Sequence, residues 1–360
     1  MSTKTITKYV GMDVHKSTIS IAMLNPDGKL VMQSVIETRK AAILEFLEGL
    51  RGTVHVTFEE GNYSAWLYPL LRPLVAKVIV CNPRKNALLK SGNKSDQIDA
   101  HKLAELLWMN RLSHVYHVDH GLETLKELWR VYATLTQDST RVMSRLKAVY
   151  RGQAIPAKGR TLYTRRRRNQ WLEQLPPQRP GLRYRVERLF EELDGLQKLR
   201  RQARAELLRE SRKQPASQIL PSIPFLGPIR TALLIARVQT PHRFRSKRQF
   251  WAYCGLGLET RSSADYGVVQ GGLQRRKKPV FIRGLNFDHN HELKSIFKST
   301  ATTASARPGP FHEFYQALLA KHMEPEMARL TLARKIAVIV LTLWKKGARF
   351  DPQYLKTQAA

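Results

Sequence analysis

The amino-acid sequence predicts an α/β N-terminal domain, a helical coiled-coil region and a mainly α C-terminal domain. We place them at residues 1–115, 116–213 and 214–350 of the 360-residue chain. Strand-like and helix-like patterns alternate up to about residue 115. Two long stretches with helical apolar spacing follow, and the last region opens on a Pro/Gly turn before an apolar helix.

The N-terminal domain is predicted to contain a mixed sheet covered by helices. The stretches "KYVGMDVHKSTISIAML" and "LVMQSVIET" are rich in β-branched and apolar residues and flank the turn "NPDGK", which indicates a hairpin. The remaining segments then alternate: "AAILEFLEGL" as a helix, "TVHVTFEE" as a strand, "SAWLYPLLRPL" as a helix and "AKVIVCNP" as a strand. The helix "NKSDQIDAHKLAELL" follows, and the order β-β-α-β-α-β-α favours a mixed sheet.

The middle region is predicted to form two antiparallel helices or a coiled coil, interrupted by an Arg-rich insertion or long loop at about residues 152–182. Within the insertion, Arg165, Arg166, Arg167 and Arg168 form an unbroken basic run. Such a run is usually a solvated face whose charges repel. Beside Tyr163 and Trp171, it could also bind phosphates while the aromatic rings stack on bases.

The C-terminal region begins with "LPSIPFLGPIRTALLIA", a Pro/Gly turn that opens onto an apolar helix. This resembles a helix-hairpin-helix element, whose turn amides can meet a DNA phosphate. Turn chemistry alone does not exclude a simple helix–turn–helix element of the core. The basic stretch "GGLQRRKKPVFIRG" follows, and "MARLTLARKIAVIVLTLWKKG" is predicted to be a core helix.

The charge balance indicates a polyanionic partner. The chain has 61 Lys and Arg against 29 Asp and Glu, a formal net charge of +32. Nucleic acid is the leading candidate, because neutralising phosphates releases counterions. A membrane surface is the second candidate, but there is no N-terminal signal peptide, and the longest apolar run, residues 336–344, is too short to span a bilayer.

The two cysteines, Cys81 and Cys254, lie far apart in the sequence. They provide neither a disulfide framework nor the spacing of a zinc site, which fits a reducing compartment. We therefore expect a cytoplasmic, nucleoid-associated protein without a membrane partner.

Four carboxylates occupy positions that suit a metal site. Val10, Met12 and Val14 share one strand face, so Asp13 points to the other, and Glu59 points away from the apolar face of its strand by the same alternation. Asp96 and Asp99 lie three residues apart at the start of a helix. Converging carboxylates repel unless a divalent cation lies between them, and hard oxygen ligands select Mg²⁺ or Mn²⁺.

Each acid also has a structural interpretation when taken singly. Asp13 could end a strand, Glu59 or Glu60 could be exposed, and Asp96 could be an N-cap. Their joint order is more informative: an acid in the first strand, an acid in a later strand, and two acids opening a helix. That order is typical of ribonuclease-H-like nucleases, in which two metal ions support phosphodiester chemistry.

Several segments resemble the insertion-sequence-110 family of transposases: "GMDVHK", "FEEGNYSAWLY", "NPRKNALLKSGNKSDQIDAHKLAELL" and "IPFLGPIRTALLIA…FRSKRQFWAYCGLGLETRSS". The resemblance extends from residue 8 to near residue 345. It implies a DEDD, RuvC-like N-terminal domain with Asp13, Glu59, Asp96 and Asp99 as metal ligands. "EEGN" departs from the family's commoner Glu-Ala-Thr-Gly, so Glu60 remains an alternative to Glu59.

The resemblance also implies a C-terminal transposase domain with a catalytic serine. The corresponding segment is "GLGLETRSSADYG", in which Leu258 replaces a proline and Ala264 a glycine, so Ser262 and Ser263 are both candidates. A serine hydroxyl is a weak nucleophile until a base or a metal activates it. The basic residues that follow would hold phosphates near that hydroxyl: Arg275, Arg276, Lys277 and Lys278.

Members of this family resemble DNA recombinases guided by a structured non-coding RNA. By this likeness the expected partners are DNA at the element ends and the target, the guide RNA, and further copies of the chain as a homodimer or homotetramer. The acid site of one subunit would then meet the serine of another.

Three functions are consistent with these features. A transposase or recombinase needs both the acids and the serine. A junction-resolving or other metal-dependent nuclease needs only the acids, with water as nucleophile. A non-catalytic nucleic-acid-binding protein needs neither, and its acids would serve as helix caps.

Overall fold

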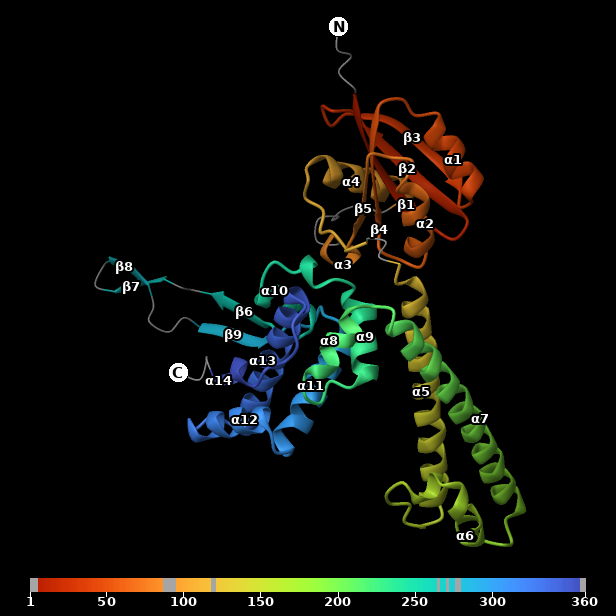
Figure 1. Ribbon diagram of the computed structural model, residues 1–360. Coiled ribbons are helices and arrows are strands. Elements are labelled where there is room, and N and C mark those ends of the chain that lie inside the picture. The colour runs from red at the N-terminus through yellow and green to blue at the C-terminus, as the bar shows by residue number, and fades with distance from the viewer. Residues whose placement is uncertain are drawn as a thin grey trace. The chain divides into compact units, whose positions relative to one another are not determined.

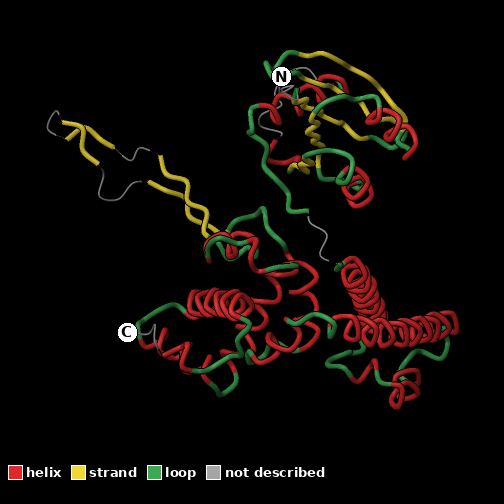
Figure 2. The backbone as a smooth tube through the Cα atoms, turned by 45° about the horizontal axis from the view of Figure 1, so that its top comes forward, coloured by secondary structure: helices red, strands yellow, loops and turns green. Residues whose placement is uncertain are grey.

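The computed structural model of the protein describes residues 6–86, 95–117, 121–263, 266–269, 272–275 and 280–356. The chain divides into two compact units, Met1–Asp119 and His120–Ala360. Figure 1 labels the elements of both units, and Figure 2 colours the same backbone by secondary structure.

The first unit is built on a five-stranded mixed sheet. Its strand order is β3-β2-β1-β4-β5, with β1 antiparallel to β2 and parallel to β4. β3 is antiparallel to β2, and β5 is parallel to β4. This confirms the predicted mixed sheet. The strands are β1 (Thr7–Val14), β2 (Thr18–Leu24), β3 (Leu30–Glu37), β4 (Thr53–Glu59) and β5 (Lys77–Cys81).

The first hairpin was predicted with one strand too few. Residues 8–24 fold back on themselves as β1 and β2, and the backbone N–H of His15 donates to the Thr18 carbonyl at 2.9 Å in the turn. A single strand of that length would extend about 55 Å, well beyond ordinary strands. The polar residues His15, Lys16 and Ser17 interrupt the apolar pattern at the turn. The order is therefore β-β-β-α-β-α-β.

Helices cover both faces of this sheet. On one face α1 (Lys40–Glu48) and α2 (Ser64–Leu71) pack on the buried side chains of Met12 and Phe58. On the other face α4 (Asp96–Trp108) lies against β1 and β2. The predicted alternation in β1 and β4 is thereby confirmed: their apolar residues face α1 and α2, and the intervening residues face α4. A short helix, α3 (Pro83–Asn86), follows β5.

Gly11 is the point at which α4 meets the sheet. A Cβ atom built at Gly11 would lie 2.5 Å from the backbone nitrogen of Ala104, and the Ala100 carbonyl oxygen would be closer still. These are backbone atoms of a helix, which cannot turn aside as a flexible side chain can. The missing side chain at Gly11 therefore allows α4 to lie directly on β1.

The second unit begins with a long antiparallel helical hairpin. α5 (Glu123–Arg151) and α7 (Pro180–Ser211) pack against each other, as predicted. Figure 1 shows the two helices side by side. Their shared core near the tip contains Leu146, Tyr150, Phe190 and Leu193.

The Arg-rich segment between these helices is more ordered than the long loop predicted. It forms η2 (Thr161–Tyr163), η3 (Arg165–Arg167) and α6 (Arg168–Glu173). Leu162 and Leu175 are buried in the hairpin core. The segment has few apolar residues among many polar ones, so its sequence shows no helical periodicity. Burial of those few apolar residues nevertheless folds the segment onto the ends of α5 and α7.

The rest of the second unit is mainly helical, as predicted. Trp129 of α5 donates to Glu292 of α11 at 2.8 Å, and Arg237 of α9 also bonds Glu292, which ties the hairpin base to the helical core. The predicted core helix α13 is buried along much of its length. The helices are α8 (Ala216–Ile219), η4 (Leu220–Ser222), α9 (Pro228–Val238), η5 (Pro241–Arg243), α10 (Lys247–Tyr253), α11 (His291–Ala306), α12 (Pro310–Ala320), α13 (Pro325–Lys346) and α14 (Gln353–Lys356).

Two β-ribbons interrupt these helices and were not predicted. In the first ribbon, β6 (Leu258–Ser263) pairs with β9 (Val280–Leu285). In the second, β7 (Tyr266–Val269) pairs with β8 (Gly272–Arg275). Both pairs are antiparallel. Both cysteines are buried, and neither is in a disulfide. Among the described residues, no helix combines the length and apolar character needed to cross a membrane.

We expect Gly11→Ala to destabilise the protein by about 1–3 kcal/mol, because the new methyl group would push α4 off β1. Thermal unfolding followed by circular dichroism measures the effect. Gly195→Ala in α7 is the matched control. Its added Cβ meets nothing within 4 Å, so it should stabilise the helix by roughly 0.5–1 kcal/mol. Unchanged unfolding of the Gly11→Ala variant would contradict the packing argument.

Candidate metal centre

Asp13 and Glu59 lie at the ends of two neighbouring parallel strands, at the last residue but one of β1 and the last residue of β4. Met12 pairs with Phe58 in the register of β1 and β4, so the next residue on each strand is a carboxylate at the same edge of the sheet. Neighbouring strands lie about 4.8 Å apart. Side chains alternate between faces, so Asp13 lies on the same side as Gly11, which is the side covered by α4.

The first turn of α4 brings two more carboxylates to this edge. Asp96 and Asp99 lie in that turn, but the N-cap is Ser95, whose Oγ accepts a hydrogen bond from the Ile98 backbone N–H at 3.2 Å. The interpretation of Asp96 as the N-cap is therefore wrong. Because Ser95 already caps the helix, capping does not explain the two aspartates.

His15 connects two of these acids. Its Nε2 atom lies 3.1 Å from Oδ2 of Asp13 and 3.5 Å from Oδ1 of Asp96. Potential ligand atoms of Asp13, His15 and Asp96 all lie within 4.8 Å of one another. Within the described ranges, Glu59 and Asp99 do not join this group. Sequence reasoning missed His15; the signal available was its position two residues after Asp13 in "MDVHK".

The residues present suit a metal ion. Two carboxylates and an imidazole converge at one sheet edge, and Glu59 and Asp99 lie on the adjacent strand and helix turn. Carboxylate oxygens are hard ligands and imidazole is accepted by several divalent ions. The structure thus brings Asp13 and Asp96 together directly and places Glu59 and Asp99 on the elements that flank them.

Glu60 has a different environment from Glu59. Its carboxylate contacts the imidazole Nε2 of His117, and its backbone N–H donates to the Cys81 carbonyl at 2.9 Å. The His117 ring in turn packs on Tyr68, with ring centroids 5.2 Å apart. Glu60 thus connects the end of β4 to His117 and β5. Because the Glu60 carboxylate is already paired with His117, Glu59 is the better candidate for a metal ligand.

The candidate serines lie in the second unit. Ser262 and Ser263 are the last two residues of β6, with Phe281 and Val280 of β9 opposite them. Arg275 ends β8. The other predicted phosphate-binding residues after it, Arg276, Lys277 and Lys278, lie outside the described residues, as does Ala264.

Half of the basic run holds the hairpin tip together. Arg168 makes a bidentate pair with the Asp194 carboxylate, through Nη1 at 2.7 Å and Nη2 at 2.5 Å, and Arg165 Nε donates to the same carboxylate at 3.0 Å. The Arg168 hydrogen bonds and the neighbouring Arg165 lower the pKa of Asp194 to about 2. Arg166 and Arg167 are exposed, so within the run they remain candidates for phosphate contact.

The aromatic residues beside the run pack inward. The Tyr163 hydroxyl donates to the Met143 carbonyl at 3.2 Å, and the Trp171 ring packs edge-on against Tyr150, with centroids 5.3 Å apart. Both rings belong to the partly buried layer around the hairpin core. These contacts account for Tyr163 and Trp171 without base stacking.

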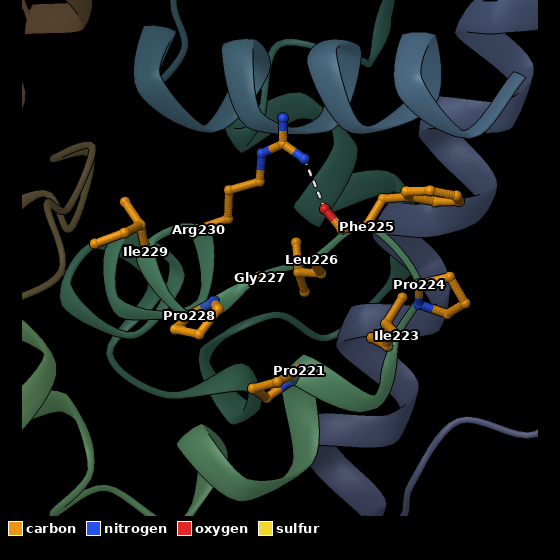
Figure 3. Close-up of a pocket in the computed structure, with 9 residues that line it drawn as sticks. All are labelled: Pro221, Ile223, Pro224, Phe225, Leu226, Gly227, Pro228, Ile229 and Arg230. Atoms are coloured by element: carbon orange, nitrogen blue, oxygen red, sulfur yellow. Dashed lines mark hydrogen bonds between the residues drawn. The ribbon is translucent and has the colours of Figure 1, made fainter. Parts of the chain in front are cut away.

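The Pro/Gly turn before α9 lines an apolar pocket (Figure 3). Gly227 is the N-cap of α9 and provides no side-chain cap, while Arg230 Nη1 donates to the Phe225 carbonyl at 2.6 Å. Phe225 has a φ of +66°, a left-handed conformation unusual for a bulky residue, and the Arg230 bond holds it. A compact turn between two helical elements agrees with the predicted motif, and phosphate binding by its amides stays a prediction.

Fold and site together define the class of this protein. A mixed sheet with acids ending β1 and β4 and opening the helix that packs on β1 is a ribonuclease-H-like domain of the DEDD type. Residues 10–152 match the family model for DEDD transposases of the IS110 type, and residues 217–316 match the model described as "Transposase IS116/IS110/IS902 family". The chain belongs to the IS110 family of transposases.

Individual relatives are similar over part of their length. The transposase for insertion sequence element IS1533 of Leptospira borgpetersenii is 29% identical over 174 residues, which cover 46% of this chain and 50% of the relative. An uncharacterized 44.8 kDa protein of insertion element IS116 from Streptomyces clavuligerus is 24% identical over 155 residues, which cover 43% of this chain and 36% of the relative. The chain thus spans half or less of the length of these curated relatives.

We expect Asp194→Asn to lower the free energy of unfolding by about 1–2 kcal/mol at neutral pH, because it removes the charge that Arg168 and Arg165 bind. The pKa of Asp194 is lowered from 3.8 to about 2. Its contribution is therefore present above the ordinary pKa and is lost as the pH falls toward 2, where wild type and variant should converge. Urea unfolding at a series of pH values measures this.

Asp138→Asn is the control for that experiment. Asp138 pairs with Arg141 at 2.8 Å on the exposed side of α5, and such pairs contribute only a few tenths of a kcal/mol. A loss of stability at Asp194→Asn that equals the loss at Asp138→Asn, or that does not depend on pH, would contradict the role given to Asp194.

Proposed function

We propose that this protein is the transposase of an insertion sequence, a DNA phosphoryl-transfer enzyme that cleaves and rejoins element ends and target DNA under the guidance of a structured non-coding RNA. The observation that carries the proposal is the group of Asp13, His15 and Asp96 at the edge of a ribonuclease-H-like sheet. Family membership and the net charge of +32 support nucleic acid as substrate and partner.

Asp13, Glu59, Asp96 and Asp99 would hold Mg²⁺ or Mn²⁺, with His15 beside Asp13 and Asp96. Bound there, divalent ions supply Lewis-acid stabilisation of the negative charge on the scissile phosphate. The protein contributes fixed positions: Asp13 and Glu59 on paired strands, and Asp96 and Asp99 on a helix that packs directly on β1. In a non-catalytic nucleic-acid-binding protein, Asp96 and Asp99 would serve as helix caps. Ser95 already caps α4, so capping does not explain these two aspartates.

Ser262 or Ser263 is the proposed nucleophile. Its oxygen forms a bond to the scissile phosphorus as the bond to the departing DNA oxygen breaks. The hydroxyl proton passes to a base, and the departing oxygen takes up a proton. A second DNA end then displaces the serine, which regenerates the hydroxyl and joins the strands. Composite sites in a homodimer or homotetramer would bring the acids of one subunit to the serine of another.

We expect Glu59→Gln and Asp99→Asn each to reduce DNA strand exchange by more than about 100-fold, since loss of residues that only support metal ligands already costs 10–100-fold. Both variants keep the side-chain shape, so folding and RNA binding should persist. Mn²⁺ binding followed by electron paramagnetic resonance should weaken in parallel. Glu60→Gln is the matched control: its carboxylate contacts His117, so recombination should be nearly normal. Normal strand exchange by Asp99→Asn would rule out the four-acid site.

We expect one of Ser262→Ala and Ser263→Ala to eliminate a covalent protein–DNA adduct on a denaturing gel while leaving Mn²⁺ binding intact. The other should retain substantial activity, because only one hydroxyl attacks phosphorus. If both single variants and the double variant recombine DNA normally, water is the nucleophile and the protein acts as a metal-dependent nuclease.

A further inference from the structure

The middle of α7 contains a run of basic residues with no acidic residue among them. No Asp or Glu occurs between Asp194 and Glu206, a stretch of about three helical turns. Four basic residues lie within it, and all of them are exposed or half-buried: Lys198, Arg200, Arg201 and Arg204. We call these four residues the α7 basic stripe. Its ends lie about 9 Å apart along the helix axis.

Several cations on either side of the stripe have acid partners. Before it, Arg183 pairs with Glu187 at 3.1 Å and Arg188 with Glu191 at 2.7 Å. After it, Arg209 pairs with Glu206, and Lys213 pairs with Glu210 at 2.6 Å. Of the described residues, none forms an ion pair with a member of the stripe.

The acids nearest to the stripe are engaged elsewhere. Asp194 lies one turn before Lys198, at a spacing that allows an ion pair, but Arg165 and Arg168 bind it instead. On the other side, Glu206 binds Arg209 rather than Arg204. Both flanking carboxylates are therefore paired with cations outside the stripe.

The partner helix does not neutralise the stripe either. Arg145 of α5 pairs with Glu192 of α7 at 3.7 Å, and the antiparallel run then places residues 133–139 of α5 alongside the stripe. That part of α5 reads "ATLTQDS", and its one acid, Asp138, binds Arg141 of its own helix. Apart from Asp138, the polar side chains in that part of α5 are uncharged hydroxyl and amide groups.

Like charges three and four residues apart destabilise a helix. Here packing of Leu193, Ala203 and Leu207 against the rest of the unit sustains the helix despite the repulsion. A polyanion would relieve that repulsion, and guanidinium groups bind phosphate through paired hydrogen bonds.

We propose that the α7 basic stripe binds the phosphodiester backbone of nucleic acid without reading its sequence. This surface, rather than the run from Arg165 to Arg168, is the main phosphate contact of the helical hairpin, because two of those arginines are bound to Asp194. The inference deepens the proposed function, since it locates part of the nucleic-acid path on the hairpin.

The test compares two triple variants of the full-length chain with equal loss of charge in one helix. The first replaces the stripe: Arg200→Gln, Arg201→Gln and Arg204→Gln. The second replaces arginines that have acid partners: Arg183→Gln, Arg188→Gln and Arg209→Gln. Glutamine and arginine have similar helix propensities, and circular dichroism monitors folding. Affinity is measured against salt concentration for a random-sequence DNA duplex and for an RNA hairpin.

We expect the slope of log affinity against log salt to become shallower by about 2–3 for the stripe variant, since each phosphate contact contributes about 0.9. The control variant should change the slope by less than about 1. A change confined to the DNA or to the RNA arm identifies which of the two supplies the phosphates. Equal slopes for the two variants, or no change in either, would overturn the proposal.

The outcome is separable from the proposed function. If the wild-type chain binds neither probe, the transposase proposal fails as well. If it binds with a steep salt dependence and the stripe variant matches the control, only the stripe assignment fails.

Discussion

The close approach of α4 to β1 over Gly11 is the constraint on which the candidate site depends. Any side chain at Gly11 would occupy the space of the α4 backbone. With glycine there, Ala100 and Ala104 lie directly on the strand, and the helix N-terminus falls next to the strand end that carries Asp13. Packing of Gly11, two residues before Asp13, against Ala100, four residues after Asp96, thus fixes the separation between the two acids. Core packing therefore determines where Asp13 and Asp96 lie, and the short distance between their carboxylates makes them suitable for binding a cation.

Sequence alternation was sufficient to orient two of the four acids, because a strand that buries one face must turn its other residues away. That argument identified Asp13 and Glu59 without any knowledge of tertiary contacts. It did not reveal His15, since a histidine after a strand is ordinary in sequence and becomes informative only when Asp96, far away in the chain, lies beside it. The roles of Ser95 and of the Glu60–His117 contact were likewise not apparent, because they depend on side-chain geometry.

The fold was predictable where one periodicity dominates and not where tertiary contacts decide. The long helices α5 and α7 and the core helix α13 follow from apolar spacing alone. The division of residues 8–24 into two strands was missed, because both halves have the same β-rich composition. The β-ribbons were missed for a related reason: their strands are only four to six residues long, so an alternating pattern does not stand out in the sequence, and pairing across the ribbon defines them. The Arg-rich segment was read as a loop because the sequence cannot show that Asp194 binds two of its arginines.

The two halves of the proposed active site differ in how firmly they are held. Asp13 and Glu59 are on inner strands of a five-stranded sheet with helices on both faces, so their backbone positions are restrained from several directions. Ser262 and Ser263 are on a two-stranded ribbon, an element that is marginally stable without further support. The base of this ribbon is fixed: the Asn286 N–H donates to Gly257 at 3.1 Å, and the Asn290 N–H donates to Tyr253 at 2.9 Å. The serines are at the other end of β6, beyond these anchors. Under the proposed function, the acid half would therefore be preformed, whereas the serine half would need support from outside the ribbon, because the described contacts that anchor the ribbon lie at its other end.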